Sequence, residues 1–181
     1  MEQLLIERIM HFLKENDLLS TRQFGFTAGK STNDAIDDTT NFIQRILDEK
    51  KVGAVVSLDI SAAFDTAWHA EIIYRLQEFG IPNNLLQLAK SYFQEGTATL
   101  MVGEAAAAKR INLGCPQGST CSPGFWMILF DGILRLDLPT GCSLTTFADD
   151  SLLRVEAANE RELEMKLNTA LGKIVNWGEK V

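Results

Sequence analysis

Three aspartates stand where apolar segments end, and carboxylates in such places can hold a metal ion. Asp59 lies near the end of the apolar run VGAVVSLDI, and Asp149 and Asp150 lie side by side between two apolar runs. An ionised carboxylate in an apolar strand is costly unless it is paired or bound to a metal. If the strands that carry them are neighbours, Asp59 and Asp149 face one another. Oxygen ligands of this kind favour Mg²⁺, and two such ions can promote an in-line phosphoryl displacement.

Each aspartate also has a simpler explanation. Asp149 and Asp150 could lie in a solvated turn, and Asp59 could cap the turn SAAFD that follows it. A tight hairpin usually carries Asn-Gly or Asp-Gly, however, and two adjacent carboxylates repel each other. The three carboxylates together therefore favour a chemical role over three separate structural ones.

The elements that position these residues are predicted from hydrophobic periodicity. Helices are expected at residues 2–15, 33–49, 67–79, 83–94, 122–136 and 159–178. Residues 52–60 are expected to form a strand that is buried on both faces. Residues 98–103 and 109–113 are expected to pair across an alanine-rich turn, and a second hairpin carries Asp149 and Asp150 at its tip. The mixture predicts an α+β fold with helices packed on one face of an antiparallel sheet.

Two of the predicted helices carry more specific signals. In the helix at 33–49, Ile36, Ile43 and Leu47 share one face. The last helix begins after Asn159, a favourable N-cap, with Glu162 three residues further on. Pro82 separates the helices at 67–79 and 83–94 because proline breaks a helix.

Composition excludes several classes of function. The chain has 181 residues, 46% of them apolar, and three cysteines without a CxxC pair, so a zinc site or a disulfide framework is not expected. No apolar run approaches the roughly 18 residues that cross a bilayer, so no membrane association is expected. The N-terminus is amphipathic with charges of both signs, unlike a signal peptide. The net charge of −7 argues against nucleic-acid binding, which relies on Lys and Arg.

Four segments in order resemble the signature motifs of reverse transcriptases. They are QFGFTAGKST (23–32), SLDISAAFD (57–65), GCPQGSTCSP (114–123) and FADD (147–150). The sequence is most similar to the polymerases of non-LTR, LINE-like retrotransposons. The resemblance implies a polymerase palm, with an antiparallel sheet packed on helices, and partial fingers. Residues 1–52 would be the partial fingers and 53–181 the palm, with a fingers/palm insert at about 66–113; a thumb is expected to be missing.

The resemblance assigns catalysis to the three aspartates. Asp59, Asp149 and Asp150 would be the catalytic carboxylates, with Asp150 the less direct ligand. Together with the backbone carbonyl of Ile60 they would bind two Mg²⁺ ions, or Mn²⁺. These ions would serve the primer 3′-hydroxyl and the triphosphate of an incoming dNTP.

The resemblance also implies a set of nucleotide-binding residues. Phe64 falls at the steric-gate position that disfavours a ribose 2′-hydroxyl, although it could be a plain core residue. The residues expected near the triphosphate and the templating base are Ala62, Ala63, Gln117 and Gly118. The Pro-Gln-Gly turn could instead be a simple helix cap.

Lys30 is a candidate ligand of the triphosphate or a solvated loop lysine. The segment is not a phosphate-binding P-loop, because Phe24 stands where that motif needs glycine. The family motif usually has arginine at the positions of Thr27 and Lys30. Lysine keeps the charge but lacks the bidentate geometry of arginine, so weak triphosphate affinity is expected.

The sequence therefore predicts the RNA-directed DNA polymerase core of a retroelement, cut from a longer polyprotein. Its partners would be an RNA template, a DNA primer, dNTPs and the remainder of the polyprotein, inside the cell in nucleus or cytoplasm. One alternative is a catalytically inactive remnant or domesticated palm domain that binds RNA or protein. Another is a different two-metal phosphoryl-transfer enzyme, such as a cyclase on a related palm, against which GCPQGS and QFGF argue.

Overall fold

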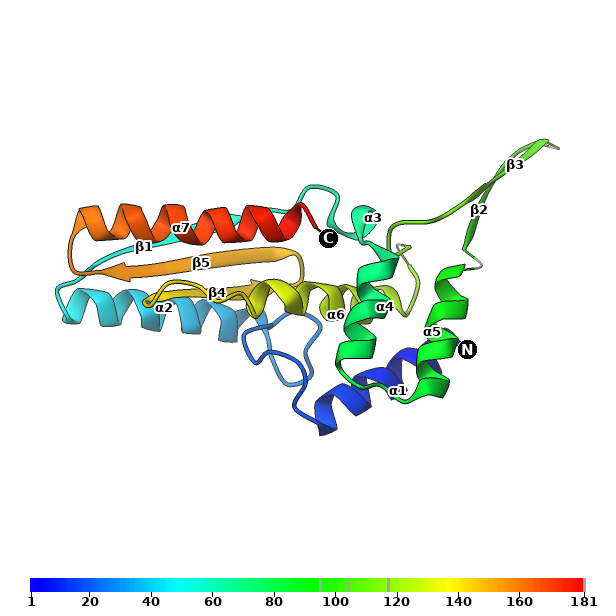
Figure 1. Ribbon diagram of the computed structural model, residues 1–181, viewed down its shortest axis with the longest axis horizontal. Helices are drawn as coiled ribbons and strands as arrows, with labels where there is room; N and C mark the ends of the chain where they lie inside the picture. Colours follow the sequence, from blue (N-terminus) through cyan, green and yellow to red (C-terminus); the bar gives the residue numbers. More distant parts are fainter. Residues whose placement is uncertain (95, 104, 117, 181) are drawn as a thin grey trace. The chain divides into compact units, whose positions relative to one another are not determined.

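The computed structural model describes residues 1–94, 96–103, 105–116 and 118–180 and divides into two compact units (Figure 1). The first, here called the helical unit, comprises Met1–Leu18 and Ala62–Leu129. The second, the sheet unit, comprises Leu19–Ser61 and Phe130–Val181. Each unit is thus built from two separate stretches of sequence, and each is described by itself below.

The sheet unit is built on three antiparallel strands in the order β1-β5-β4. These are β1 (Val52–Leu58), β4 (Cys142–Phe147) and β5 (Asp150–Ala157). Leu58 pairs with Ser151 at one end of the β1–β5 ladder, and Phe147 pairs with Asp150 at the same end of the β4–β5 ladder. The turn of the β4–β5 hairpin is therefore Ala148 and Asp149. The predicted hairpin is confirmed, but its turn lies one residue earlier than Asp149-Asp150, since Asp150 begins β5.

Strand β1 is an edge strand, and the expectation that it is buried on both faces was wrong. Its residues alternate between half-buried and exposed, and Val55 is 38% exposed. An apolar run of β-branched residues predicts a strand, but the side chains alone do not tell whether a neighbour covers its second face. The central strand β5 is instead buried on both faces, since Leu153, Arg154 and Val155 are all buried in succession.

Helices α2 (Thr32–Asp48) and α7 (Glu160–Gly178) pack on this sheet, on opposite sides of the strands in Figure 1. Arg154 of β5 pairs with Asp38 of α2 at 2.6 Å. Since side chains of a strand alternate between faces, Leu153 and Val155 point away from α2. Both faces of β5 are buried, so helices cover both faces of the sheet and not the single face that was expected.

The apolar stripe predicted on α2 is exposed. Ile36, Ile43 and Leu47 are 56%, 44% and 63% exposed, whereas Phe42 and Ile46 are buried. Two contacts determine which side of α2 faces the sheet. The ion pair between Asp38 and Arg154 draws one side of α2 to the sheet, and Gly53 leaves room for Ile46, whose Cδ1 lies only 2.4 Å from where a Cβ on Gly53 would stand.

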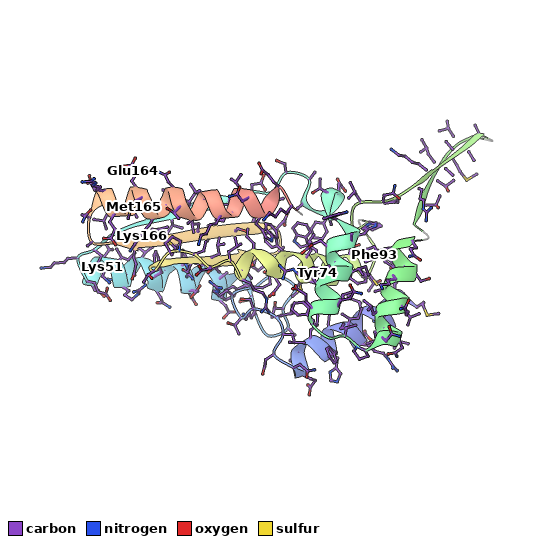
Figure 2. All side chains as sticks on the ribbon, viewed as in Figure 1. Lys51, Tyr74, Phe93, Glu164, Met165 and Lys166 are labelled. Atoms are coloured by element: carbon purple, nitrogen blue, oxygen red, sulfur yellow. The ribbon has the colours of Figure 1, made fainter. Side chains whose placement is uncertain are left out.

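The helix starts follow from capping side chains. Ser31 caps α2 in a capping box with Asp34, and the Asn159 side chain accepts a hydrogen bond from the Glu162 amide at 3.0 Å, as predicted for α7. Figure 2 shows Glu164 and Met165 on the outer side of α7. The Lys166 ammonium instead reaches back and donates to the backbone carbonyl of Glu156 at 3.0 Å.

The helical unit consists of short helices around an aromatic centre. Its elements are α1 (Glu2–Glu15), α3 (Ala63–Thr66), α4 (His69–Glu78), α5 (Asn83–Gln94) and the first part of α6 (Ser122–Leu134). The rings of Phe93 and Phe125 lie 4.7 Å apart between α5 and α6. Tyr74 is exposed on α4, whereas Phe93 is buried (Figure 2). The predicted helices at 67–79, 83–94 and 122–136 are confirmed with small shifts of their ends.

Strands β2 (Thr97–Val102) and β3 (Ala105–Arg110) form a two-stranded ribbon. The expected pairing across an alanine-rich turn was wrong, because the four alanines form β3 itself. Gly103 follows β2 with a φ of +62°, a conformation that suits glycine in a tight turn. Within the described ranges, no helix of the chain is long and apolar enough to cross a membrane.

Candidate functional site

The three predicted carboxylates lie at one end of the sheet in the sheet unit. Asp150 begins β5, Asp149 precedes it in the turn, and Asp59 directly follows β1. Because β1 and β5 are antiparallel and Leu58 pairs with Ser151, the next residues outward are Asp59 and Asp150. The neighbour of β1 is thus β5, and the chain continues from this last pair to Asp59 on one strand and to Asp150 and then Asp149 on the other.

These carboxylates are accessible to solvent. Asp59 and Asp150 are exposed and Asp149 is half-buried, so the burial cost expected for Asp59 does not arise. Like charges still gather at one end of the sheet and repel one another. None of the ion pairs in the described part of the chain involves Asp59, Asp149 or Asp150.

The donor set fits a hard divalent cation in its chemistry. Carboxylate and carbonyl oxygens are the ligands that Mg²⁺ prefers, usually with only one or two carboxylates and the remaining positions filled by water or substrate phosphates. Among residues 1–94, 96–103, 105–116 and 118–180, no three His, Cys, Asp or Glu side chains are already gathered closely enough to hold a metal. Ile60, the predicted carbonyl ligand, lies directly after Asp59 outside any strand.

The QFGF segment runs alongside the hairpin that carries Asp149. The Phe24 amide donates to the Thr146 carbonyl at 2.8 Å, and the Thr146 amide donates to the Arg22 carbonyl at 3.0 Å. Gln23 and Thr146 form an isolated parallel bridge. The segment therefore covers the outer edge of β4, which would otherwise present unpaired backbone groups.

Gly25 allows this segment to touch the turn itself. A Cβ atom on Gly25 would lie 2.2 Å from the backbone nitrogen of Ala148 and 2.9 Å from its Cα. Ala148 has a φ of +59°, which is uncommon for a residue with a side chain. Two backbone segments thus meet without intervening side chains, one residue before Asp149.

Lys30 is engaged with its own loop in this structure. Its ammonium donates to the carbonyl of Gln23 at 3.0 Å and to that of Thr21, and it lies 4.5 Å from the centre of the Phe24 ring. Burial lowers the pKa of Lys30, while the charges of Asp38 and Asp34 act to raise it. Lys30 therefore stabilises its own loop through these backbone carbonyls. It is not a freely solvated side chain, and it makes no P-loop contact.

A row of buried polar side chains crosses the sheet next to the hairpin turn, and it was not predicted. The Gln23 side-chain nitrogen and the hydroxyls of Thr146 and Ser151 are buried without a hydrogen-bond partner in the described part of the chain. Thr146 pairs with Gln23 on one side and with Ser151 on the other. The buried carboxylate of Asp131 was also missed, although a single acidic residue in the apolar stretch FWMILFDGIL was a visible signal.

In the helical unit, the segment after SLDIS lies beside the segment before the Pro-Gln-Gly turn. The Cys115 amide donates to the Phe64 carbonyl at 2.6 Å and the Gly114 amide to the Ala67 carbonyl at 2.8 Å. Gly114 has a φ of +92°, and a Cβ there would lie 2.8 Å from the Asp65 carbonyl oxygen. Glycine is therefore needed at this crossing. Burial raises the pKa of the Cys115 thiol to about 12, so the thiol is neutral.

The predicted nucleotide-binding residues of this unit differ in exposure. Phe64 is half-buried with its ring 5.2 Å from that of Trp126, so it is not a plain core residue. Ala63 is buried, and Ala62 is exposed with a φ of +56° at the start of α3. No side chain in the described ranges caps α3, so the alternative that Asp59 is a cap was wrong.

The Pro-Gln-Gly turn is only partly described. Gln117 lies outside the described residues, and Gly118 is exposed with a φ of +89°. The Ser119 hydroxyl accepts a hydrogen bond from the Cys121 amide at 3.2 Å, and the Ser122 hydroxyl donates to the Pro116 carbonyl at 2.7 Å. The Ser119 hydroxyl thus binds the amide of the residue before α6, and the Ser122 hydroxyl ties the first residue of α6 to the preceding turn.

The structure brings the predicted residues together in two groups. Asp59, Asp149, Asp150 and Lys30 belong to the sheet unit, together with Ile60. Ala62, Ala63, Phe64 and Gly118 belong to the helical unit. In the helical unit, the backbone hydrogen bond from Cys115 to Phe64 joins two signature segments that are distant in sequence. In the sheet unit, Phe24 of the QFGF segment bonds to Thr146, the third residue before Asp149.

Sequence comparison gives matches that cover the whole of this chain. A family model described as reverse transcriptase (RNA-dependent DNA polymerase) matches residues 1–181. A putative 115 kDa protein of the type-1 retrotransposable element R1DM of Drosophila melanogaster is 29% identical over 100% of this chain and 17% of its own length. An RNA-directed DNA polymerase from the mobile element jockey of the same species is 26% identical over 99% of this chain and 20% of its own. The chain thus spans about a fifth of these curated relatives.

Comparison with solved structures supports the same fold at low sequence identity. A telomerase from Candida albicans, in complex with a fragment of telomeric RNA, has a TM-score of 0.69 at 12% identity and covers 94% of this chain and 32% of its own. An apo telomerase from Candida tropicalis has a TM-score of 0.66 at 15% identity, over 96% of this chain and 35% of its own. At these identities the likeness shows the fold alone.

Proposed function

Since this chain belongs to the reverse transcriptase (RNA-dependent DNA polymerase) family, we propose that it is the RNA-directed DNA polymerase core of a non-LTR retrotransposon. Its α+β fold, with an antiparallel sheet packed on helices, is that of a polymerase palm. The observation that carries the proposal is the register of the sheet. Its last pair, Leu58 and Ser151, immediately precedes Asp59 on one strand and follows Asp150 on the other, and Asp149 lies in the adjoining turn.

The metal ligands in this proposal are Asp59, Asp149, Asp150 and the Ile60 carbonyl. Reverse transcriptases generally use divalent ions, and these oxygen donors suit two Mg²⁺ or Mn²⁺ ions. Ions bound there would activate the primer 3′-hydroxyl and stabilise the leaving pyrophosphate. The carboxylates place negative charge at one end of the sheet. The short Ala148–Asp149 turn limits the directions in which the Asp149 side chain can point.

The remaining residues are proposed to bind the incoming nucleotide. Phe64 would contact the sugar, the Ala62 and Ala63 backbone would approach the triphosphate, and Gln117 and Gly118 would contact the base pair being formed. Lys30 would reach the triphosphate only by leaving the carbonyls of Thr21 and Gln23. Its desolvated position and its loss of those hydrogen bonds both predict a weak contribution to dNTP affinity.

The partners follow from the proposed reaction. They are an RNA template, a DNA primer and dNTPs, together with the remainder of a longer polyprotein. We also propose that residues 1–52 form partial fingers and residues 53–181 the palm, with an insert at about 66–113. The chain would act inside the cell, in the nucleus or the cytoplasm.

Primer extension tests the proposal directly. The chain is incubated with an RNA template, an annealed DNA primer, dNTPs and Mg²⁺, and labelled product is resolved by length. We expect template-directed extension that chelation of the metal abolishes. If the folded chain binds the RNA–DNA duplex but adds no nucleotide, the proposed activity is refuted and the chain acts as a binding module.

Substitution Phe64→Val is expected to relax the choice of sugar. The half-buried phenylalanine ring is held by Trp126, and valine removes most of its bulk at the sugar position. Discrimination of this steric kind is worth about 1–3 kcal/mol, so the preference for dNTPs over rNTPs should fall about tenfold or more. The ratio of kcat/KM for dATP and ATP measures it, and Tyr74→Val, at an exposed aromatic of α4, is the control. An unchanged ratio would assign Phe64 to packing alone.

A further inference from the structure

Asp131 is a buried charge in a helix that is otherwise apolar. Its side chain is only 2% exposed, and it is the one acidic residue that is fully buried in the described ranges. It lies in the last part of α6, which belongs to the sheet unit. Burying a carboxylate costs free energy unless hydrogen bonds and an opposite charge compensate. An apolar residue would fill this position at lower cost, so the contacts of Asp131 need an explanation.

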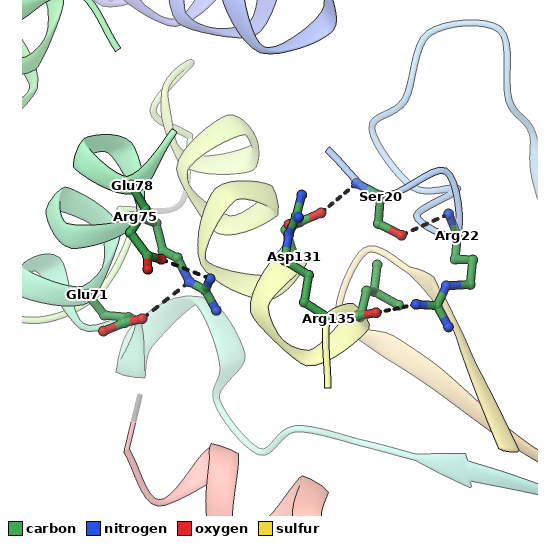
Figure 3. A network of polar contacts seen from close by, with 8 residues as sticks. Ser20, Arg22, Glu71, Arg75, Glu78, Asp131 and Arg135 are labelled. Atoms are coloured by element: carbon green, nitrogen blue, oxygen red, sulfur yellow. Dashed lines mark hydrogen bonds and ion pairs between the residues drawn. The ribbon is translucent and has the colours of Figure 1, made fainter. Parts of the chain in front are cut away.

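Those contacts go to the loop before QFGF (Figure 3). One carboxylate oxygen accepts a hydrogen bond from the Ser20 backbone amide at 2.6 Å. The other is paired with Arg135, one turn later on the same helix. Arg22 adds a second tether, because its guanidinium donates to the Leu134 carbonyl at the end of α6. Asp131 and Arg22 thus fasten the loop to the helix at two points.

The fastened loop is also the segment that touches the hairpin. The Arg22 carbonyl and the Phe24 amide hold Thr146, and Gly25 meets the backbone of Ala148 next to Asp149. A short path of backbone contacts therefore runs from Asp131 through Ser20 and Arg22 to the turn that presents Asp149. Each step is a hydrogen bond or a direct backbone contact inside one compact unit, so displacement of the loop is transmitted to the turn.

We propose that Asp131 is a positioning residue, which fixes the QFGF segment against the Ala148–Asp149 turn and thereby sets the position of the Asp149 carboxylate. This inference rests on the proposed polymerase function for its catalytic meaning. The working part of Asp131 is the acceptor oxygen for the Ser20 amide. The negative charge is needed less, because the Arg135 side chain is 45% exposed and water solvates its charge in the asparagine variant.

Two substitutions of Asp131 separate these roles. Asp131→Asn keeps an acceptor for the Ser20 amide, whereas Asp131→Leu keeps the branched shape and removes the acceptor. Hydrogen exchange at the Phe24 and Thr146 amides reports the loop–hairpin contact without any need for activity. We expect exchange at least about tenfold faster in the leucine variant, near wild-type exchange in the asparagine variant, and unchanged exchange in the β1–β5 ladder in both.

Steady-state kinetics give the second readout. In the leucine variant, kcat for primer extension should fall about tenfold to a hundredfold with little change in the KM for dNTP, because a displaced catalytic group affects the reacting geometry. The asparagine variant should stay within about threefold of wild type. Arg135→Lys is the matched control, since it changes the neighbouring side chain but keeps an opposite charge for the buried carboxylate and leaves the Ser20 hydrogen bond; it should also stay within about threefold.

The outcomes are distinguishable. Unchanged exchange at Phe24 and Thr146 in a folded leucine variant would overturn the proposal, as would equal loss of kcat in the asparagine and leucine variants. If the leucine variant does not fold, Asp131→Ala also removes the acceptor for the Ser20 amide, and its exchange at the same two amides decides in the same way. If wild type extends no primer, the proposed function fails, while exchange still decides whether Asp131 holds the hairpin.

Discussion

Primer extension by the Asp149→Asn variant is expected to be at least about a thousandfold slower than by wild type. Asparagine keeps the size of the side chain in the Ala148–Asp149 turn and removes its charge. Charge stabilisation by a bound divalent ion contributes several kcal/mol to such a displacement, and each 1.36 kcal/mol corresponds to a factor of ten in rate. Single-turnover extension on an RNA template, with Mg²⁺ in excess, measures the effect.

The same substitution should leave the fold intact. Asp149 is half-buried and takes part in none of the ion pairs of the described residues, so its charge repels Asp59 and Asp150 without compensation. The free energy of unfolding in urea should therefore stay equal or rise slightly without metal. Asp137→Asn, at a fully exposed carboxylate outside the predicted site, is the control and should keep full activity. An Asp149→Asn variant with more than a tenth of wild-type activity would refute the metal assignment.

The parts of the fold set by neighbouring residues were predictable. Asn159 and Glu162 define the start of α7 through a cap that needs only four consecutive residues. Pro82 separates α4 from α5 for an equally local reason. The β4–β5 hairpin was predicted because two apolar runs flank a two-residue turn, even though the turn is Ala-Asp and carries a positive φ at Ala148.

The errors arise where burial depends on elements distant in sequence. The apolar run of β1 is compatible with a central strand or an edge strand, and only the pairing order β1-β5-β4 distinguishes them. Likewise, Ile36, Ile43 and Leu47 form a regular stripe on α2, but Gly53 and Arg154 draw a different side of the helix to the sheet. In both cases the deciding partner is a residue of another element, which periodicity does not include.

In the candidate site, too, local features were predictable and those that depend on distant elements were not. The identities of Asp59, Asp149 and Asp150 were predictable from residue type and from the resemblance to a polymerase family. The neighbour of Asp59 was not, because it depends on which strand of the hairpin pairs with β1. The bridge between Gln23 and Thr146 was also beyond the sequence pattern, since its partner lies in a strand that is distant in sequence.

Gly25→Ala is expected to be the most damaging substitution outside the carboxylates. The new methyl group would stand 2.2 Å from the Ala148 nitrogen and 3.0 Å from the Phe147 carbonyl carbon, and both are backbone atoms that cannot rotate away. The QFGF segment and the turn must therefore separate. Overpacking of this kind costs about 1–3 kcal/mol, and a displacement of about 1 Å at the turn can lower the rate about a hundredfold. Urea unfolding and primer extension measure the two effects.

Gly172→Ala is the matched control because Gly172 lies on an exposed face of α7, where a Cβ would meet no heavy atom of the described residues within 4 Å. Alanine in a helix interior is favoured over glycine by about 1 kcal/mol, so this variant should gain stability and keep its activity. A general effect of reduced chain flexibility would shift both variants in the same direction. Equal stability and activity of the two alanine variants would show that Gly25 does not hold the turn, and the path from Asp131 to Asp149 would then lose its last step.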